Sequence, residues 1–352
     1  MTLFNPRISP VERVAFTKML SLLFRSGIPI NEILDIIEQQ APRGARRALA
    51  NIAQSVRSGT PLHQAFERYP SLFPSVFVSL IRAGEMSGTL DETLERLAVH
   101  FQKEYEARRK VLTASLYPLL VLGGAVILSF VLTFVVLPRL LPVFHGLGTD
   151  LPVLTRVLIW VVERVARYGI ILAAAMFVSL ISIVWFLKIP FIRRITHPMM
   201  LRAPLAGFMI RSMNLATVLR TLAVLLKSGV PVDQSIMLVK ETVGNVAYQT
   251  DLAHILERIR QGNPIGTTLS STNAYRWPPL VTQMIQAGEK TGRFDETLFY
   301  LADFYDSAID ESTKRFVAMV EPILILGIGL VVGLIALAII GPIYNLSGNI
   351  QP

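Results

Sequence analysis

A chain of 352 residues in which 52% of the residues are hydrophobic and only 17% are charged is too apolar for an ordinary soluble protein, whose charged share is about 25%. Its mean hydropathy of +0.51 favours a membrane protein. The net charge of +9 accompanies no nucleic-acid-binding motif, so we expect no nucleic-acid partner, and the lack of cysteine excludes disulfides, thiolate metal sites and a cysteine nucleophile.

The N-terminal segment has no signal-peptide pattern and predicts a helix that ends at the sequence SGIP. Val14, Met19 and Leu22 keep near-helical spacing. Gly27 would supply a left-handed C-terminal cap, with Pro29 just beyond it. Strand signals are weak, so we expect a small all-α bundle. Further helices are predicted over residues 31–40, 45–58, 61–68 and 74–83.

The sequence RAGEMSGTLDETL, residues 82–94, is predicted to connect two helices. The first helix would end at Gly84, and the loop would turn at Gly88. Thr89 and Glu92 have the spacing of a capping box for the next helix. Asp91 and Glu92 would lie in its first turn, where carboxylates favour the positive end of the helix macrodipole.

The next helix meets no helix breaker before Pro118 and leads into an uncharged apolar stretch. Leu94, Leu97 and Phe101 keep helical spacing. An unbroken helix over residues 90–137 would be about 70 Å long at 1.5 Å per residue. The sequence therefore predicts a rigid stalk from the bundle into the bilayer.

Three apolar stretches reach the roughly 20 residues needed to cross about 30 Å of hydrocarbon. They cover residues 118–137, residues 168–187 and the run that begins at Pro322. Lys and Arg number 15 before the first stretch, 4 between the first and second, 15 between the second and third, and none after the third. The positive-inside rule then places the two strongly basic segments in the cytoplasm. The stretches contain no ionisable residue, which argues against a transport pathway.

The predicted organisation is an all-α membrane protein of two cytoplasmic helical domains and three transmembrane helices. It comprises domain 1 at residues 1–116, transmembrane helices at 117–138, 168–187 and 322–341, a periplasmic loop at 139–167, domain 2 at 188–321 and a periplasmic tail at 342–352.

The chain contains an internal duplication. Residues 16–34 match residues 218–236 at an offset of 202, which places Gly27 on Gly229. Residues 81–94 match residues 285–298 at an offset of 204, with nine identities in fourteen positions. An offset that drifts by only two residues over a whole domain indicates that domain 2 repeats domain 1.

No pattern indicates a catalytic or metal site. QAGEKTG, residues 286–292, lacks the earlier glycine that a P-loop requires. The five histidines are scattered without ligand spacing. A divalent ion on the acidic turns is a weaker explanation than the helix macrodipole. We therefore expect no enzymatic activity, no cofactor and no metal.

Two interpretations remain open for Glu85 and Glu289. Each carboxylate could satisfy backbone donors in the helix connection, or it could contact a partner protein. Glu321 could pair with nearby basic side chains at the membrane edge or contact a basic partner. Gly329 and Gly333 form a G-x-x-x-G pattern that could pack the chain's own spans together or drive self-association.

The duplicated SG(I/V)P helix end, the AGE-x-(S/T)-G turn, the long helix entering the membrane and EPILILGIGLVVG at the last span together carry a family resemblance. The chain resembles the secretion F family, the inner-membrane platform proteins of type II secretion and type IV pilus machines. The resemblance covers nearly the whole chain. Because the first repeat starts near the beginning of the chain, at Phe16, the chain resembles the shorter pilus-type members.

The resemblance implies a non-enzymatic machine part of the bacterial inner membrane. Its implied partners are a cytoplasmic hexameric assembly ATPase, pilins, other inner-membrane assembly proteins, membrane lipid and further copies of the chain. The function expected is pilus assembly, with a type II secretion platform or a small membrane transporter as alternatives. Candidate residues are Glu85, Asp91, Glu92, Glu289, Asp295 and Glu296 for partner contact, Gly27, Gly84, Gly88, Gly229, Gly288 and Gly292 for structural turns, and Pro118, Glu321, Pro322, Gly329 and Gly333 for transmembrane packing or pilin contact.

Overall fold

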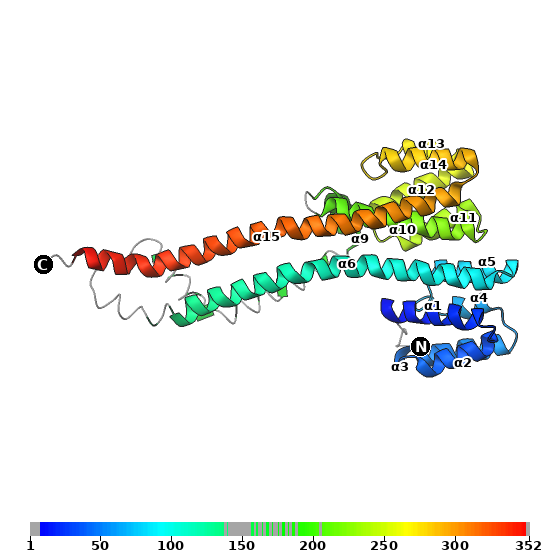
Figure 1. The fold of residues 1–352 in the computed structure, drawn as a ribbon, viewed down its shortest axis with the longest axis horizontal. Coiled ribbons are helices and arrows are strands. Elements are labelled where there is room, and N and C mark those ends of the chain that lie inside the picture. Colours follow the sequence, from blue (N-terminus) through cyan, green and yellow to red (C-terminus); the bar gives the residue numbers. More distant parts are fainter. Residues whose placement is uncertain are drawn as a thin grey trace. The chain divides into compact units, whose positions relative to one another are not determined.

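The computed structural model describes residues 8–136, 189–203 and 206–349, together with isolated positions between residues 139 and 186. Within these residues all regular secondary structure is helical (Figure 1). The chain divides into two compact units. One comprises Met1–Lys110 with Arg194–Ser312, and the other comprises Val111–Arg193 with Thr313–Pro352.

The first copy of the repeat forms a bundle of five short helices and the beginning of a long one. Side chains from all six helices join one buried core, in which Leu94 and Leu97 of the long helix are fully buried. The helices are α1 (Pro10–Arg25), α2 (Ile30–Gln40), α3 (Arg43–Arg57), α4 (Leu62–Glu67), α5 (Ser75–Ser87) and α6 (Leu90–Val131).

The second copy has the same order of elements and is preceded by one additional short helix. The paired helices α3 and α12 both have 15 residues, α4 and α13 both have 6, and α5 and α14 both have 13. The fold therefore shows the duplication that the sequence predicts. The helices are α9 (Pro190–Leu201), α10 (Gly207–Lys227), α11 (Val232–Thr242), α12 (Val246–Arg260), α13 (Ile265–Ser270), α14 (Pro279–Thr291) and α15 (Phe294–Asn349).

Glycine ends the helices at the same places in both copies. Gly27 and Gly229 follow α1 and α10 with φ of +79° and +80°, and Gly88 and Gly292 follow α5 and α14 with φ of +72°. A residue with a Cβ rarely adopts this left-handed conformation, so glycine lets the chain leave the helix within one residue. The stops predicted at SGIP and its repeat are confirmed.

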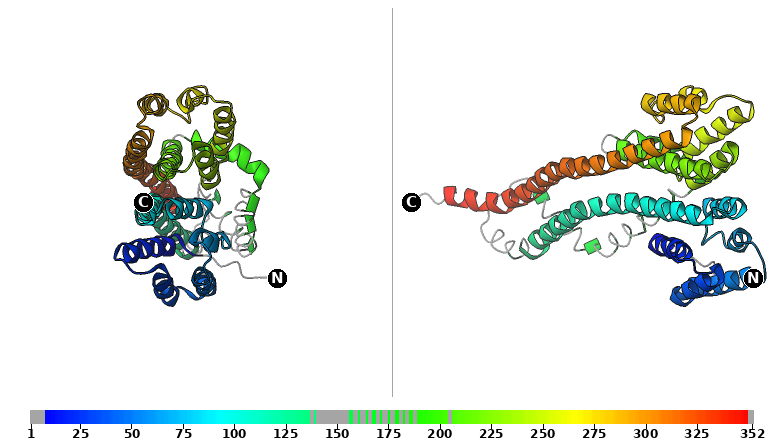
Figure 2. Two further views of the ribbon diagram at one scale, coloured as in Figure 1. Left: turned by 90° about the vertical axis from the view of Figure 1, so that its right-hand side faces the viewer. Right: turned by 45° about the vertical axis from the view of Figure 1, so that its right-hand side comes forward.

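The long helices α6 and α15 pass from the first unit into the second (Figures 1 and 2). With 42 and 56 residues, they are about 63 Å and about 84 Å long. The structure confirms that no break occurs at Pro118, which lies inside α6. A π-helical segment, Leu132–Val136, replaces α-helical geometry beyond Val131.

Three helices are long and apolar enough to cross a membrane by length and composition. The apolar windows of α6 and α15 are 0% and 6% buried, whereas the window of α10 is 67% buried. The burial identifies α10 as a core helix of its bundle. The predicted span at residues 168–187 and the loop at 139–167 lie mostly outside the described residues, and α15 continues past residue 341 to Asn349.

Two local predictions were wrong. Helix α5 does not end at Gly84 but continues one turn further to Ser87. The capping box predicted at Thr89 and Glu92 does not form, because the Thr89 hydroxyl lies 2.7 Å from the Ser87 hydroxyl and Glu92 accepts from Arg96 at 2.8 Å. A capping box that the sequence analysis missed forms instead at the start of α1.

That capping box uses the sequence SPVE. Ser9 Oγ accepts from the Glu12 backbone N–H at 3.2 Å, and the Glu12 carboxylate accepts from the Ser9 N–H at 2.6 Å. Ser followed three residues later by Glu is the signal for this arrangement, and Pro10 occupies the first helical position. The signal was available in the sequence.

Candidate functional site

The repeated AGE turn joins each bundle to the start of its long helix. Gly88 in the left-handed conformation ends α5, and the Thr89 N–H donates to the Gly84 carbonyl at 2.9 Å. Helix α6 then begins at Leu90, as α15 begins at Phe294. The turn thus fixes the direction in which the long helix leaves the bundle.

Gly84 and Gly288 allow the helices on either side of the turn to approach closely. A Cβ at Gly84 would lie 2.7 Å from Thr93 Oγ1, and one at Gly288 would lie 2.5 Å from Thr297 Oγ1. Both distances are well below van der Waals contact. Both glycines lie inside helices, at positions where a side chain does not fit. Gly84 is therefore a close-contact residue and not the predicted helix end.

The Glu85 carboxylate caps the N-terminus of α4. Oε1 accepts from the Leu62 backbone N–H at 2.8 Å, and Oε2 accepts from the His63 N–H at 3.2 Å. The His63 ring Nδ1 also lies 2.6 Å from Oε2. Pro61 precedes α4 and supplies no side-chain cap, so the donors at its N-terminus are satisfied by a residue more than twenty positions later.

Glu289 repeats this arrangement in the second copy. Its carboxylate accepts from the Ile265 N–H at 2.9 Å and from the Gly266 N–H at 3.0 Å, at the N-terminus of α13. Pro264 again precedes the helix without a side-chain cap. The two glutamates therefore have the same backbone-capping contacts, and a partner contact by either remains a prediction.

Burial acts to raise the pKa of Glu85, but the hydrogen bonds from His63 and from the Leu62 and His63 backbone outweigh it and hold that pKa below its ordinary value. The carboxylate is charged at neutral pH. A charged acceptor at a helix N-terminus also interacts favourably with the helix macrodipole.

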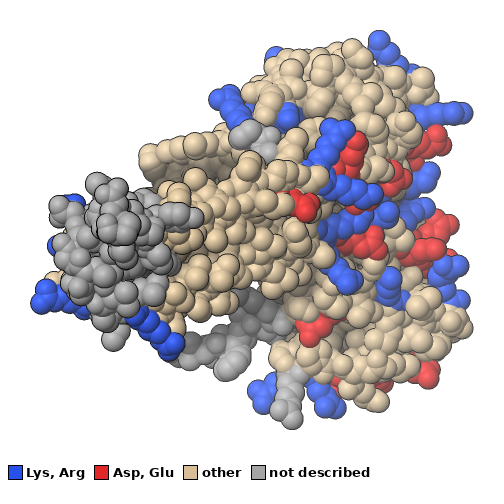
Figure 3. Space-filling model, turned by 60° about the vertical axis from the view of Figure 1, so that its left-hand side comes forward, with Lys and Arg blue, Asp and Glu red and all other residues tan. Residues whose placement is uncertain are grey.

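The acidic first turns of α6 and α15 differ in what their carboxylates contact. Asp295 accepts from Lys227 Nζ at 2.9 Å, and this hydrogen bond is the main cause of its lowered pKa. Glu92 forms an exposed i,i+4 pair with Arg96. Asp91 and Glu296 are exposed to solvent. Of the six predicted acidic contact residues, Asp91, Glu92 and Glu296 present the most accessible carboxylates. Charged side chains of both signs lie on the surface of the bundles (Figure 3).

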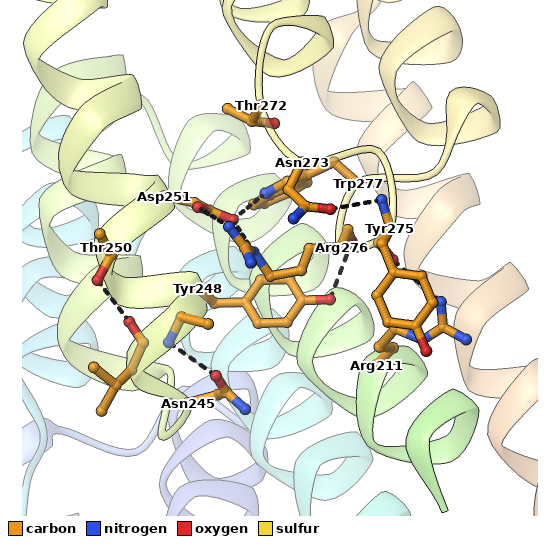
Figure 4. Close-up of polar contacts among 12 residues, drawn as sticks. Arg211, Asn245, Tyr248, Thr250, Asp251, Thr272, Asn273, Tyr275, Arg276 and Trp277 are labelled. Atoms are coloured by element: carbon orange, nitrogen blue, oxygen red, sulfur yellow. Dashed lines mark hydrogen bonds and ion pairs between the residues drawn. The ribbon is translucent and has the colours of Figure 1, made fainter. Parts of the chain in front are cut away.

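The second copy contains a buried polar cluster that no sequence pattern predicted (Figure 4). Asp251 on α12 accepts from Arg276 Nε and Nη2 at 2.6 and 2.7 Å, and from the Trp277 indole Nε1 at 2.9 Å. The pairing raises the pKa of Arg276. The Tyr248 hydroxyl donates to the Arg276 carbonyl at 3.1 Å, and its ring lies edge-on to Trp277.

The first copy has a purely apolar core at the equivalent positions. Because α3 and α12 correspond throughout, Asp251 falls on Ala48, and the segment before α14 places Trp277 on Phe73. Phe73 joins Phe16, Phe66 and Phe77 in a cluster with ring centroids 4.5–6.2 Å apart. An indole N–H in a core needs an acceptor, and Asp251 supplies it.

The segment before α14 also holds the end of α9. The Tyr275 hydroxyl donates to the Leu201 carbonyl at 3.0 Å. Arg211 Nη1 donates to the Tyr275 carbonyl at 3.2 Å, and its guanidinium stacks 3.8 Å from the Tyr275 ring centroid (Figure 4). These contacts attach α9 to the second bundle.

The apolar halves of the long helices contain the remaining predicted residues. Pro118 lies within α6, and Glu321, Pro322, Gly329 and Gly333 lie within α15. A Cβ at Gly329 or Gly333 would meet no described atom within 4 Å. Packing of another helix against this pair stays a prediction. In the described part of the chain, no three acidic, histidine or cysteine side chains are grouped to hold a metal ion.

Comparison with known proteins agrees with this architecture. The family model of the type II secretion system (T2SS) protein F matches the chain twice, at residues 16–138 and 218–342. The type IV pilus assembly protein PilC of Thermus thermophilus is 33% identical over 340 residues, covering 96% of this chain and 82% of that protein. The type II secretion system protein F of Aeromonas hydrophila is 31% identical over 351 residues, covering 99% and 90%.

The double match reproduces the duplicated bundles and their long helices, and the relatives are aligned along nearly the whole chain. These relatives are structural membrane components of pilus and secretion systems, not enzymes. The chain belongs to the type II secretion system protein F family of membrane proteins.

Proposed function

We propose that this chain is the inner-membrane platform of a type IV pilus assembly system, which transmits the work of a cytoplasmic hexameric ATPase to pilins in the membrane. The observation that carries the proposal is the continuity of α6 and α15, each of which leads from a folded bundle into an uncharged apolar stretch. A continuous helix resists bending, so a displacement of the bundle is passed along it.

In this arrangement both bundles are cytoplasmic, and residues 139–167 and 342–352 are periplasmic. The Lys and Arg distribution supports this orientation. Single cysteines introduced into the cysteine-free chain test it. A membrane-impermeant maleimide added to spheroplasts should label a cysteine at residue 148 and leave one at Ser58 unlabelled until the membrane is permeabilised. The reverse pattern contradicts the orientation.

The exposed acidic side chains in the first turn of α6 are the proposed ATPase contact. Asp91 and Glu92 are exposed, whereas the Glu85 carboxylate is occupied by backbone donors. The Asp91→Asn, Glu92→Gln variant removes both charges with little change in shape. Capture of the assembly ATPase by the purified variant should fall well below wild type. Glu32→Gln, which removes an exposed carboxylate from the first turn of α2, serves as the control. Equal capture by all three contradicts this contact.

Deletion of the gene tests the function as a whole. Cells lacking the protein should retain pilin but carry no surface filaments by electron microscopy, and the wild-type gene should restore them. Unchanged filaments after deletion contradict the pilus assignment.

A type II secretion platform is the second candidate, because the relatives of that system match at nearly the same identity as the pilus relatives. Loss of secreted proteins from the culture medium, with filaments intact, would favour it.

A further inference from the structure

Helix α9 presents an apolar stripe to solvent. Phe191, Ile195 and Met199 are 71%, 59% and 73% exposed. Residues four positions apart lie above one another on a helix, so the three side chains form one continuous face. Such a row of large apolar side chains is costly to leave in water.

Other residues of α9 attach it to the second bundle. Leu201 is buried, and its carbonyl accepts from the Tyr275 hydroxyl. His197 Nδ1 accepts from the Val246 N–H at 3.1 Å, at the start of α12. The contacts that hold α9 on the bundle therefore do not involve the stripe. The stripe remains exposed and can bind another surface.

The charged side chains that α9 and its flanking residues contribute are all basic. Lys188, Arg193, Arg194 and Arg202 lie in or beside α9, and the three arginines are exposed. No Asp or Glu occurs between Glu163 and Asp233. A helix that presents exposed apolar side chains beside exposed arginines complements anionic lipid headgroups above acyl chains.

The position of α9 in the chain also favours a contact with lipid. The apolar stretch of residues 168–187 ends directly before Lys188, and α9 begins at Pro190. Trp185 and Phe186, near the end of that stretch, are exposed aromatic residues of the type enriched at membrane–water interfaces. A helix that starts two residues after a membrane span is close to the bilayer surface.

We propose that α9 lies in the membrane–water interface, with Phe191, Ile195 and Met199 inserted among the lipid chains and its arginines against anionic headgroups. The helix would hold the second bundle against the bilayer on the side where the apolar stretch ends. The proposal does not depend on whether the machine builds a pilus or secretes proteins.

Spin labels on single cysteines test the proposal in the full-length chain. The protein contains no native cysteine, so Met199→Cys and Met86→Cys each carry one label. Met86 at the end of α5 is 80% exposed and is a matched control of the same residue type. Both chains are reconstituted in vesicles of equal parts phosphatidylglycerol and phosphatidylethanolamine, and collisions with oxygen and with a water-soluble nickel chelate are measured.

The label at residue 199 should collide readily with oxygen and rarely with the nickel chelate, at a depth of about 5–10 Å into the boundary between headgroups and acyl chains. The label at residue 86 should show the opposite preference. Equal nickel accessibility at both positions would overturn the proposal. Low accessibility of residue 199 to both reagents would also overturn it, because that result indicates a protein cover such as a second copy.

The basic residues are tested separately. In vesicles that contain phosphatidylglycerol, the label at residue 199 should lie less deep in the Arg193→Gln, Arg194→Gln variant than in the chain that keeps both arginines. The label in the chain that keeps both arginines should also lie less deep in vesicles of phosphatidylcholine alone. An unchanged depth in both comparisons would overturn the role assigned to the arginines.

Discussion

Glu85 and Glu289 each supply a cap that a neighbouring helix lacks in its own sequence. A proline precedes both α4 and α13 and offers no acceptor, while a carboxylate from α5 or α14 accepts from two backbone N–H groups. The cap also ties two helices of the bundle together. The repeated glutamate is thus explained by local structure, whatever else it contacts.

Replacing Glu289 by Ala should lower the free energy of unfolding by about 0.5–2 kcal/mol, the usual cost of losing an N-cap. The effect should be local, so hydrogen exchange of the Ile265 and Gly266 amides should accelerate. Glu296→Ala, which removes an exposed carboxylate in the first turn of α15, is the control and should leave these amides protected. Unchanged exchange in Glu289→Ala would contradict the capping role.

The lowered pKa of Glu85 makes its contribution to stability depend on pH. The contribution is fully present above the ordinary value of 4.5 and is lost as the pH falls through the lower value of the folded state. Glu85→Gln should therefore destabilise the chain at pH 7 and differ less from wild type at about pH 3. Thermal unfolding at the two pH values measures this, and a difference that does not shrink in acid would refute it.

Single-residue roles were predictable from the sequence only where both partners are close in the chain. The left-handed glycines at 27 and 88 follow from their position after an apolar helix. The pairing of Glu85 with Leu62 joins residues that no local pattern connects. The sequence therefore suggested backbone capping as one of two roles for Glu85. It did not identify the helix that Glu85 caps.

At the scale of elements, the close approach of α5 to α6 depends on Gly84. Gly84→Ala places a methyl group 2.7 Å from Thr93 Oγ1 and should destabilise the chain by about 1–3 kcal/mol through overpacking. Gly44→Ala is the matched control, since nothing lies within 4 Å of its added methyl group and alanine favours a helix. Denaturant unfolding compares the two, and equal stability would show that the turn tolerates a wider spacing.

The buried cluster between α12 and the segment before α14 corresponds to an apolar set in the first copy, which suggests a replacement. Asp251→Ala alone leaves Arg276 and the Trp277 N–H without their acceptor and should cost about 2–3 kcal/mol. The combined Asp251→Ala, Arg276→Leu, Trp277→Phe variant reproduces Ala48, Leu72 and Phe73 and should recover much of that loss. A triple variant less stable than Asp251→Ala would show that the second copy cannot accept an apolar core.

Helical periodicity and breakers predicted the helices of the first bundle, with ends shifted by a few residues, and the repeat extended them to the second bundle. Helix α9 was not predicted. The errors have physical causes. The prediction that a helix ends at Gly84 was wrong because glycine occurs both in helix caps and at close helix contacts, and only the tertiary structure distinguishes the two. The rest of α12, the whole of α13 and two loops separate Asp251 from Arg276 and Trp277, so their contact follows from the fold rather than from spacing.

At the scale of the whole molecule, the length of α6 bears on the proposed transmission of movement. Exposed Leu112 and Leu116 lie between its bundle and its apolar half. Replacing both by glycine weakens the helix by about 1 kcal/mol per residue relative to alanine. The glycine pair should reduce filament number while the alanine pair does not, at equal protein levels by immunoblot. Equal filament numbers would argue against transmission through a rigid α6.

The architecture of the whole chain was the most predictable feature. The offset of the repeats, the two long helices and the apolar stretches all depend on patterns that extend over many residues, and random variation does not imitate them. The double match of the family model confirms the duplication.

The different cores of the two copies also affect how the chain folds as it is synthesised. Two similar bundles in one chain could exchange helices, a known route to misassembly in repeat proteins. If α12 took the place of α3, Asp251 would be buried against Leu72 and Phe73, which offer no side-chain donor. If α3 took the place of α12, Arg276 and Trp277 would lose their acceptor. Each exchanged arrangement would leave buried polar groups without a partner. The polar cluster therefore favours the assembly of each bundle from its own helices.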